Sequence, residues 1–298
     1  MTMARPLGLA FQLGARTLFR VERRLVRVGL SLDEALSAAA PVLPPLDADG
    51  DGYLITSLNA DALGAVATQG MIAFVRQRYT RYHADLSIGF DAWFGGLSGN
   101  TRSGLKRKAK KLAPLDVRRF RSADELAAFH VLARKLAAKT YQEKLMGGAL
   151  PDAPEFVRAM VEQAAADQVR AWLLYQDGAP IAYLYCPIRD GVVHYAYVGH
   201  DPAANDLSPG AVLQLEAMRD LYAEGNLRQF DFTEGEGQHK RSMATGGVPC
   251  CDLLLLRPTL ANRATIAGLK AFDTGVAAAK AGVARLGLAD WARKVRRG

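Results

Sequence analysis

The sequence predicts an α/β (α+β) protein built around a mixed, mostly antiparallel central sheet. Half of its 298 residues are apolar, which is enough for a large buried core. From residue 116 onward, apolar runs that alternate like strands are interleaved with runs that have helical spacing. Two Asp-Gly dipeptides, at 177–178 and 190–191, separate three of the strand-like runs and favour hairpin turns. We expect this part to be preceded by a smaller α/β half and flanked by amphipathic helices at the two chain ends.

Residues 1–50 are predicted to hold a basic amphipathic helix and a linker. From residue 11 to residue 30, five arginines fall within one arc of about 100° on a helical projection, and apolar residues fall opposite. These arginines are Arg16, Arg20, Arg23, Arg24 and Arg27. Pro-Pro and Asp-Gly pairs within residues 41–52 indicate that a linker follows the helix.

Residues 51–115 are predicted to form the smaller N-terminal α/β half. Residues 51–59 and 71–87 have the composition of strands, and residues 90–112 are mostly helical. The helical stretch contains a dense basic run at residues 106–111. This half is therefore expected to end in a basic helix.

Residues 116–258 are predicted to form the main domain, and residues 259–298 a basic helical tail. The main domain reads as strand, helix, helix, three-strand meander, helix, strand, short helix and strand. The expected ranges are 117–120, 124–143, 155–166, 171–175, 181–187, 192–198, 211–224, 229–232, 238–243 and 251–256. In the third meander strand, alternation places Val193, Tyr195 and Tyr197 on one face of the sheet and His194 on the other.

The positive charge of the chain is concentrated in three segments. Residues 1–30, 100–121 and 285–298 carry net charges of +5, +8 and +4, while the whole chain carries +8. The remainder is therefore acidic. This distribution indicates that the three segments meet anionic partners, for which lipid, coenzyme A phosphates and nucleic acid are the candidates.

Several classes of protein are disfavoured by the sequence. The three cysteines, Cys186, Cys250 and Cys251, suit neither a disulfide framework nor a metal site, and the five histidines share no ligand spacing. No run of 18 apolar residues suggests a membrane span, and residues 1–15 lack the charge order of a signal peptide. A cytoplasmic protein without a bound metal is expected.

Three stretches of the sequence carry a resemblance to a known family. They are Leu97-Ser-Gly-Asn-Thr-Arg-Ser-Gly-Leu-Lys-Arg-Lys, the segment from His200-Asp201-Pro202 to Leu207-Ser-Pro-Gly-Ala-Val-Leu213, and Phe230-Asp-Phe-Thr-Glu-Gly-Glu-Gly-Gln-His-Lys240. With the order of elements, they resemble the GNAT acyltransferases. The closer similarity is to the exopolysaccharide-associated, Fem-like CelD/BcsL-type branch and its bacterial ceramide synthase-like members. His239 departs from the aromatic residue more usual in the branch, and the glycine-rich phosphate loop is reduced to Pro209-Gly210.

The resemblance implies an acyl-CoA co-substrate, an amine acceptor and a set of binding residues. A helix that starts at Ser208, Pro209, Gly210 and Ala211 would place backbone N–H groups and its dipole against the pyrophosphate. Tyr197 and Val198 would lie beside the thioester, and Lys240 would hold a phosphate or the acceptor. Read without the resemblance, the same residues make an ordinary capped helix and a half-buried strand.

Candidate catalytic residues are ionisable groups close to these binding segments. Glu234, Glu236, His239 and His200 are the candidates for a base, because an imidazole or a carboxylate of raised pKa can accept a proton near neutral pH. Tyr141 is a candidate acid for the leaving thiolate. The alternatives are a solvated acidic loop and a tyrosine packed on its helix.

The function expected from this pattern is acyl transfer from CoA to the amine of an acceptor at the inner membrane. A long-chain amino lipid such as a sphingoid base is favoured, and an amino sugar of an exopolysaccharide or its lipid-linked precursor is the alternative. Residues 1–30 and 285–298 are expected to contact the anionic membrane surface. Nucleic-acid binding through residues 106–111 is a remote alternative, because no aromatic residues for base stacking are interleaved there.

Overall fold

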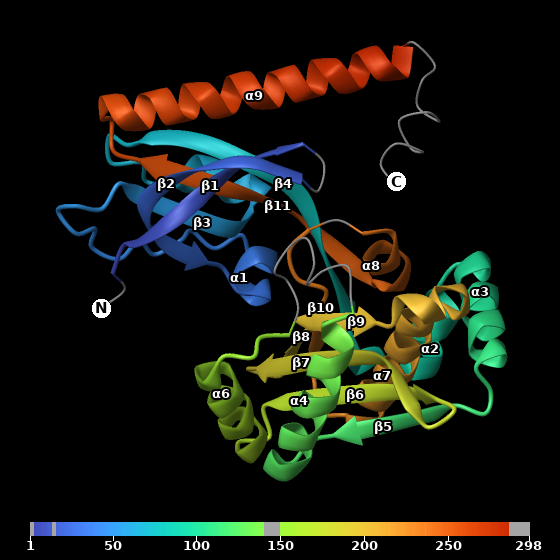
Figure 1. The fold of residues 1–298 in the computed structure, drawn as a ribbon. Coiled ribbons are helices and arrows are strands. Elements are labelled where there is room, and N and C mark those ends of the chain that lie inside the picture. Colours follow the sequence, from blue (N-terminus) through green and yellow to red (C-terminus); the bar gives the residue numbers. More distant parts are fainter. Residues whose placement is uncertain (1–2, 14–15, 140–149, 236, 286–298) are drawn as a thin grey trace. The chain divides into compact units, whose positions relative to one another are not determined.

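The computed structural model describes residues 3–13, 16–139, 150–235 and 237–285, which belong to two compact units (Figure 1). Unit 1 comprises Met1–Arg78 and Cys250–Gly298, and unit 2 comprises Tyr79–Pro249. Unit 1 is therefore assembled from both ends of the chain. Strands β4 (Ile72–Asp85) and β11 (Gly246–Leu256) each contribute residues to both units.

Unit 1 is a sheet in the order β1-β2-β3-β11-β4. Its other strands are β1 (Arg5–Leu13), β2 (Arg16–Gly29) and β3 (Gly52–Asn59), and its helices are α1 (Leu32–Leu36), the short 3-10 helix η1 (Ala60–Ala65) and α9 (Leu260–Arg285). β2 pairs with β3 in parallel, whereas β1–β2 and β3–β11 are antiparallel. One face is a core around Ile55 and Leu58, and the other is covered by α9.

The expected helix over residues 11–30 is wrong, because β1 and β2 form an antiparallel hairpin there. Leu9, Phe11 and Leu25 are buried against α9, which strand alternation allows. The β-branched residues Val21, Val26 and Val28 also favour a strand over a helix. β2 further supplies the parallel partner of β3, so a helix here would leave an edge of β3 unpaired.

The predicted helical tail is confirmed from Leu260 to Arg285 as α9. Ile266 and Leu269 are buried with the inward residues of β1, β2 and β11, and Phe272 meets the edge of Phe11. Arg23 of β2 donates to Asn262 and Thr265 on the same helix. The sheet of unit 1 therefore covers the apolar face of α9 from Ile266 to Phe272. Residues 286–298 lie outside the described part of the chain.

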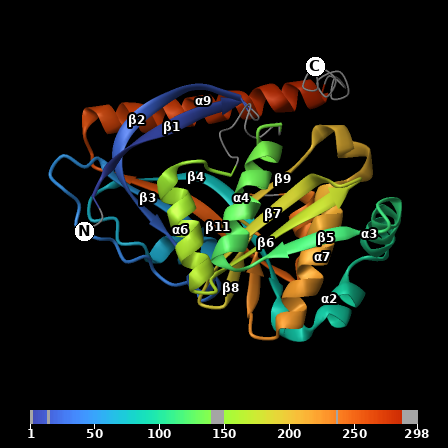
Figure 2. The ribbon, with the colours of Figure 1, turned by 60° about the horizontal axis from the view of Figure 1, so that its bottom comes forward.

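Unit 2 contains the main sheet, in the order β4-β10-β8-β7-β6-β5, with β9 paired to β7 (Figure 2). Its strands are β5 (Asp116–Phe120), β6 (Val169–Gln176), β7 (Ala179–Arg189), β8 (Val192–His194), β9 (Tyr197–His200) and β10 (Gln229–Asp231). β8 and β10 are parallel, and the other pairs with a determined register are antiparallel. The predicted mixed, mostly antiparallel sheet is confirmed.

Helices cover both faces of the unit 2 sheet. They are α2 (Phe90–Gly96), α3 (Gly99–Lys111), α4 (Ala123–Ala137), α6 (Pro154–Ala165), α7 (Pro209–Glu224) and α8 (Gln238–Met243), with short 3-10 helices η2 (Leu86–Ile88) and η3 (Pro202–Leu207). α4 and α6 pack on the face that carries Tyr183 and Tyr185. α2, α3 and α7 pack on the opposite face around Trp93 and Phe230.

The predicted meander is confirmed as β6, β7 and the pair β8–β9. Asp177 and Gly178 have φ values of 50° and 77°, and Asp190 and Gly191 have 50° and 74°. Positive φ at both central residues is what a two-residue hairpin turn with the correct twist requires, and Asp-Gly supplies it. Ser122 and Glu125 form a reciprocal capping box at the start of α4, which is a local signal of the sequence.

Gly199 in β9 is expected to tolerate no side chain. A Cβ built there would lie 2.4 Å from a ring carbon of Tyr183, which is itself fully buried. Gly199→Ala should therefore lower the free energy of unfolding by about 1–3 kcal/mol, since the packed ring must move. Gly104→Ala in α3 is the matched control, because no atom lies within 4 Å of its Cβ and alanine favours the helix by about 1 kcal/mol. Urea unfolding of both variants checks this, and equal stability of the two would contradict it.

Candidate functional site

The third strand of the meander divides at Tyr195 and Ala196, and a fork opens there. β8 pairs with β10 up to His194 and Asp231, and the Tyr195 N–H still donates to the Asp231 carbonyl at 2.9 Å. β9 then pairs with β7, and no other described strand pairs with it. The edge of β9 that faces away from β7 is thus left without a strand partner in the described chain.

The fork is accompanied by a shift in side-chain alternation. Tyr195 and Val198 both pack on the α7 side of the sheet, whereas Tyr197 packs on the α4–α6 side. Strict alternation would have placed Tyr195 and Tyr197 on one face, so that expectation is wrong. The exposed Ala196 is the additional residue that reverses the alternation, as in a β-bulge.

A buried charged cluster lies at the apex of the fork. The Asp231 carboxylate is fully buried and accepts hydrogen bonds from Arg81 Nη2 at 2.6 Å, Arg81 Nε at 3.2 Å and the Thr233 N–H at 2.8 Å. His194 Nδ1 lies 3.2 Å from the same carboxylate. Burial alone would raise the pKa of Asp231, but hydrogen bonds from His194 and Arg81, and the Arg81 charge, lower it to about 2. The carboxylate is therefore ionised at neutral pH.

A second histidine completes a row across three strands at this level. Asp231 is paired in register with His83 of β4 on one side and with His194 of β8 on the other. Burial lowers the pKa of His83, and this outweighs the nearby charges of Asp231 and Asp85. Its Nδ1 is buried and makes no hydrogen bond to described atoms. His83 is therefore neutral near pH 7, beside an ionised aspartate.

The loop after β10 brings three of the predicted residues close to this cluster. Lys240 Nζ donates to the Glu234 carbonyl at 2.6 Å, and burial lowers the pKa of Lys240 against the opposing charges of Asp231 and Glu234. The His239 ring lies 6.0 Å from that of Tyr195, and its pKa is lowered by burial and by the Lys240 charge. Two further predicted residues, Glu236 and Tyr141, lie outside the described residues.

The start of α7 has the geometry of a small anion site. Ser208 has a left-handed backbone and its side chain makes no capping bond, and Pro209 occupies the first turn. The N–H groups of Ala211 and Val212 both donate to the Ser208 carbonyl. The Gly210 N–H has no acceptor among the described residues. An anion could therefore bind one N–H and the positive end of the helix dipole.

His200 is placed at the start of α7 and not at the apex of the fork. Its Nδ1 would lie 3.9 Å from a Cβ on Gly210, and its Nε2 is 2.7 Å from the Asn205 side-chain oxygen. Tyr197 and Val198 lie on β9, between these two places. The predicted residues therefore divide into a phosphate end at α7 and a polar end around Asp231.

Sequence reasoning missed Arg81, His194 and Asp231 as site residues. A usable signal was present, since Asp231 stands between Phe230 and Phe232 in a strand where an unpaired charge would be costly. Both phenylalanines are fully buried in the core on the α7 side. A carboxylate inserted into such a strand needs partners, and they come from two other strands.

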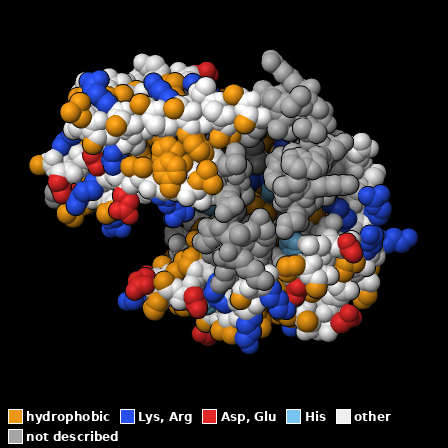
Figure 3. Space-filling view, turned by 45° about the horizontal axis from the view of Figure 1, so that its top comes forward, with side chains coloured by type: hydrophobic (Ala, Val, Ile, Leu, Met, Phe, Trp, Pro, Cys, Tyr) orange, Lys and Arg blue, Asp and Glu red, His pale blue; other side chains and the backbone are white. Residues whose placement is uncertain are grey.

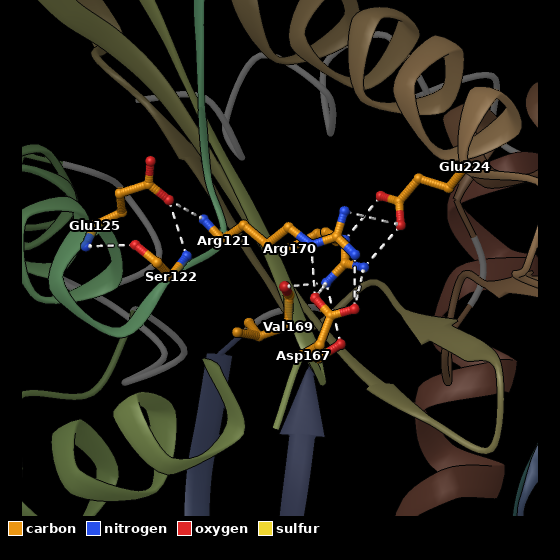
Figure 4. A network of polar contacts seen from close by, with 7 residues as sticks. All are labelled: Arg121, Ser122, Glu125, Asp167, Val169, Arg170 and Glu224. Carbon is orange, nitrogen blue, oxygen red and sulfur yellow. Dashed lines mark hydrogen bonds and ion pairs between the residues drawn. The ribbon is translucent and has the colours of Figure 1, made fainter. Parts of the chain in front are cut away.

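A second charged cluster lies at the start of β6 and the end of α7 and is structural in character. Arg121, Asp167, Arg170 and Glu224 point toward one another, while Ser122 and Glu125 form the adjacent cap of α4 (Figure 4). A cavity of about 260 Å³ beside it is lined by the same arginines and by Asp220. Every charged group of the cluster has an opposite partner, so it holds elements together and leaves no charge for a ligand.

Other chemistries receive little support from the described residues. Cys186 and Cys251 are buried, and burial raises the pKa of both thiols, which disfavours a thiolate nucleophile. Within the described ranges, no group of three His, Cys, Asp or Glu side chains could hold a metal ion. None of the described helices combines the length and the apolar character needed to cross a bilayer. Exposed basic residues gather on α3, and Figure 3 shows them at the edge of the view where that helix lies in Figure 1.

Comparisons with known proteins agree with the fold described above. Residues 99–241 match the family model described as an Acetyltransferase (GNAT) domain. The structure is similar to that of FemX, with 10% identity, a TM-score of 0.51 and coverage of 86% of this chain and 89% of that one. It is also similar to the C-terminal domain of an Agrobacterium fabrum protein described as a lysylphosphatidylglycerol synthetase. That pair has 12% identity, a TM-score of 0.50 and coverage of 70% and 68%. No curated protein matches the chain. At these sequence identities, similarity to solved structures is evidence for the fold alone.

Proposed function

We propose that the protein, whose residues 99–241 match the family model of a GNAT acetyltransferase domain, moves an acyl group from coenzyme A to the primary amine of a membrane-associated acceptor. The first candidate acceptor is a long-chain amino lipid such as a sphingoid base. Its acylation would form a ceramide-type amide. The acyl-CoA is a co-substrate, and the proposed reaction uses no metal.

The observation that carries the proposal is the fork between β9 and β10. An extended pantetheine chain has amide groups that can pair with an open strand edge, as a peptide does when it adds a strand. The edge of β9 beyond Tyr195 offers such groups. In this arrangement Tyr197 and Val198 flank the thioester, and the apex of the fork holds the reacting carbonyl.

The phosphate end of coenzyme A is assigned to the start of α7. The Gly210 N–H and the helix dipole supply the positive potential there, and the His200 ring lies beside Gly210. Ser208 and Pro209 fix the approach of the chain, and Ala211 lies in the first turn. Lys240, Glu234, His239 and Glu236 are assigned to the acceptor end, because the first three surround the end of β10.

A membrane-associated acceptor is supported by the surface of the β1–β2 hairpin. Leu18 and Phe19 are half exposed, and Arg20 beside them is exposed as well. Apolar side chains among arginines are suited to the boundary of an anionic bilayer. Residues 285–298, which carry a net charge of +4, are a second candidate contact.

The second candidate is acetylation of an amino sugar in an exopolysaccharide or its lipid-linked precursor. The family description favours it, because that description names an acetyltransferase, and an acetyl group is a short acyl group. The two candidates differ in the preferred donor. A long-chain donor with a sphingoid base supports the first, and acetyl-CoA with an amino sugar supports the second.

Acyl-CoA is expected to stabilise the protein against heat. At 100 times its dissociation constant it should add about 2.7 kcal/mol to the free energy of unfolding. Gly210→Leu should reduce this shift, since a side chain would occupy the space over the free N–H, whereas Gly104→Ala should keep it. Differential scanning fluorimetry with acyl-CoA of several chain lengths measures both. No shift with any donor would contradict the proposal.

Binding to anionic vesicles is expected through the hairpin. The double variant Leu18→Asp, Phe19→Asp should float less with phosphatidylglycerol vesicles than the parent protein, because it replaces apolar contacts with repelled charges. Val42→Asp is the control, since Val42 is an exposed apolar residue outside the hairpin. Flotation at low salt is the measurement. Absence of binding by the parent would remove the membrane part of the proposal.

A further inference from the structure

We propose that His194 is the proton acceptor of the transfer reaction and that Asp231 and Arg81 are its positioning residues. This inference rests on the proposed function and assigns a role to residues of the buried cluster at the fork. The assignment is supported by the hydrogen bond of the His194 ring, its partial exposure and its place on β8.

The contacts of the His194 ring determine which nitrogen is basic. Its Nδ1 lies 3.2 Å from Asp231 Oδ2, and an ionised carboxylate can only accept, so Nδ1 carries the proton. In the neutral ring, Nε2 then holds the free lone pair. No other hydrogen bond of this ring is formed with the described residues. A carboxylate that fixes the tautomer and leaves the distal nitrogen as the base is the arrangement of hydrolase triads.

The partner of His194 is itself held firmly. Arg81 donates to both oxygens of Asp231, and the Thr233 N–H donates to one of them. The Arg81 and Asp231 side chains are 6% and 0% exposed, whereas that of His194 is 20% exposed. The dyad thus has a buried end at Asp231 and a partly exposed end at His194, which is what proton exchange with a bound amine requires.

The position of His194 places the open end at the reacting carbonyl of the proposed complex. His194 is the last residue of β8, directly before the strands part. Val193 packs in the core on the α7 side, so alternation directs His194 to the opposite face. The other titratable or charged groups near it are Asp231 on β10, Arg81 and His83 on β4, and Lys240 on α8.

The neighbouring candidates lack one of these features. The Nδ1 of His83 is buried and has no hydrogen-bond partner among the described residues, so a bound amine cannot reach this nitrogen. His239 rests against Tyr195, and none of the ion pairs in the described chain joins it to a carboxylate. The Lys240 ammonium already donates a hydrogen bond to the Glu234 carbonyl. His194 alone among these groups combines an orienting carboxylate with an exposed distal nitrogen.

The proposed acyl transfer conserves atoms and charge. The acceptor enters as an ammonium and gives one proton to His194 Nε2, and the neutral amine then attacks the thioester carbonyl. A C–N bond forms, the C–S bond breaks, and the second amine proton passes to the departing CoA thiolate. The imidazolium returns its proton to water. The products are the amide and CoA-SH, and no oxidant or other co-reactant is needed.

Kinetics of His194→Gln and Asp231→Asn test the assignment. We expect kcat to fall about 10²–10⁴-fold in both, with the acyl-CoA thermal shift retained. The acidic limb of the kcat/KM profile should disappear in His194→Gln, and imidazole should partly restore His194→Ala. Asp220→Asn is the control for loss of a buried aspartate, since Asp220 contacts Trp172 and Arg119 away from the fork. Loss of the acidic limb in His239→Gln or Lys240→Met but not in His194→Gln would overturn the assignment.

A measurement without any acyl donor separates this inference from the proposed function. Long-range ¹H–¹⁵N spectra of labelled parent protein should show His194 protonated at Nδ1, and Asp231→Asn should abolish that preference. An Nε2–H tautomer in the parent would overturn the assignment even if the enzyme acylates amines. The expected tautomer in a protein that consumes no acyl-CoA with any amine would refute the acyl-CoA function, and the assigned step with it.

Discussion

Arg81→Met is expected to lower the free energy of unfolding of unit 2 by about 3–5 kcal/mol. The substitution leaves the Asp231 carboxylate in the interior with its main counter-charge removed. Breaking a buried pair in this way is far more costly than breaking a surface pair, because the remaining charge cannot reach water. Urea unfolding followed by tryptophan fluorescence gives the value, since Trp93 and Trp172 are both buried in this unit.

The pH dependence of this loss has a definite sign. The folded-state pKa of Asp231 is depressed to about 2 from an ordinary value of 3.8, so the ionised pair stabilises the fold above pH 4 and this stabilisation is lost as pH falls toward 2. The difference between the parent and Arg81→Met should therefore be largest near neutral pH and shrink in acid. Arg118→Met is the control, because its pair with Asp116 is half exposed and solvent can replace the contact. A loss as small as that of the control would contradict the prediction.

Arg170→Met should lower the free energy of unfolding by a similar amount, about 3–5 kcal/mol. Its guanidinium is buried and donates to both oxygens of Glu224 at 2.7 Å, to Asp167 at 2.9 Å and to the Val169 carbonyl at 2.8 Å. Removing it leaves the carboxylates of Asp167 and Glu224 with the half-exposed Arg121 as their remaining cation. The start of β6 and the end of α7 should then separate more easily, which urea unfolding would report as a lower midpoint.

Arg121→Met is the matched control within the same network. Arg121 also pairs with Asp167, at 2.6 Å, but its side chain is 51% exposed. Solvent can replace its contacts, so the loss should stay near about 1 kcal/mol. If the two variants were equally unstable, burial would not be the factor that decides the strength of this network.

Much of unit 2 could be predicted because its signals are local. Asp-Gly turns fixed the meander, a capping box marked the start of α4, and Ser208-Pro209-Gly210 marked the start of α7. The hairpin of β1 and β2 could not be predicted in this way. Its arginines suit a helical arc as well as a strand, and the choice is made by β3, which pairs with β2 from beyond the linker.

The candidate site was predictable only at its phosphate end. The start of α7 is a continuous stretch of sequence, so a motif search within a short window can find its residues together. The apex cluster joins Arg81 to an aspartate 150 positions away and that aspartate to a histidine 37 positions before it. No periodicity within a window connects such residues. The one local indication was the charge of Asp231 between two buried phenylalanines.

The assembly of unit 1 from both chain ends has a consequence for protein synthesis. β3 (Gly52–Asn59) leaves the ribosome long before its antiparallel neighbour β11 (Gly246–Leu256), because all of unit 2 is translated between them. At ordinary elongation rates the delay is roughly 10–40 s, during which the apolar edge of β3 is open to wrong partners. Unit 2 can complete its own contacts first. In a nascent chain that stalls within residues 79–249, the N-terminal part of unit 1 therefore lacks β11 and cannot complete its sheet. Such a chain should depend on chaperones more than the finished protein does.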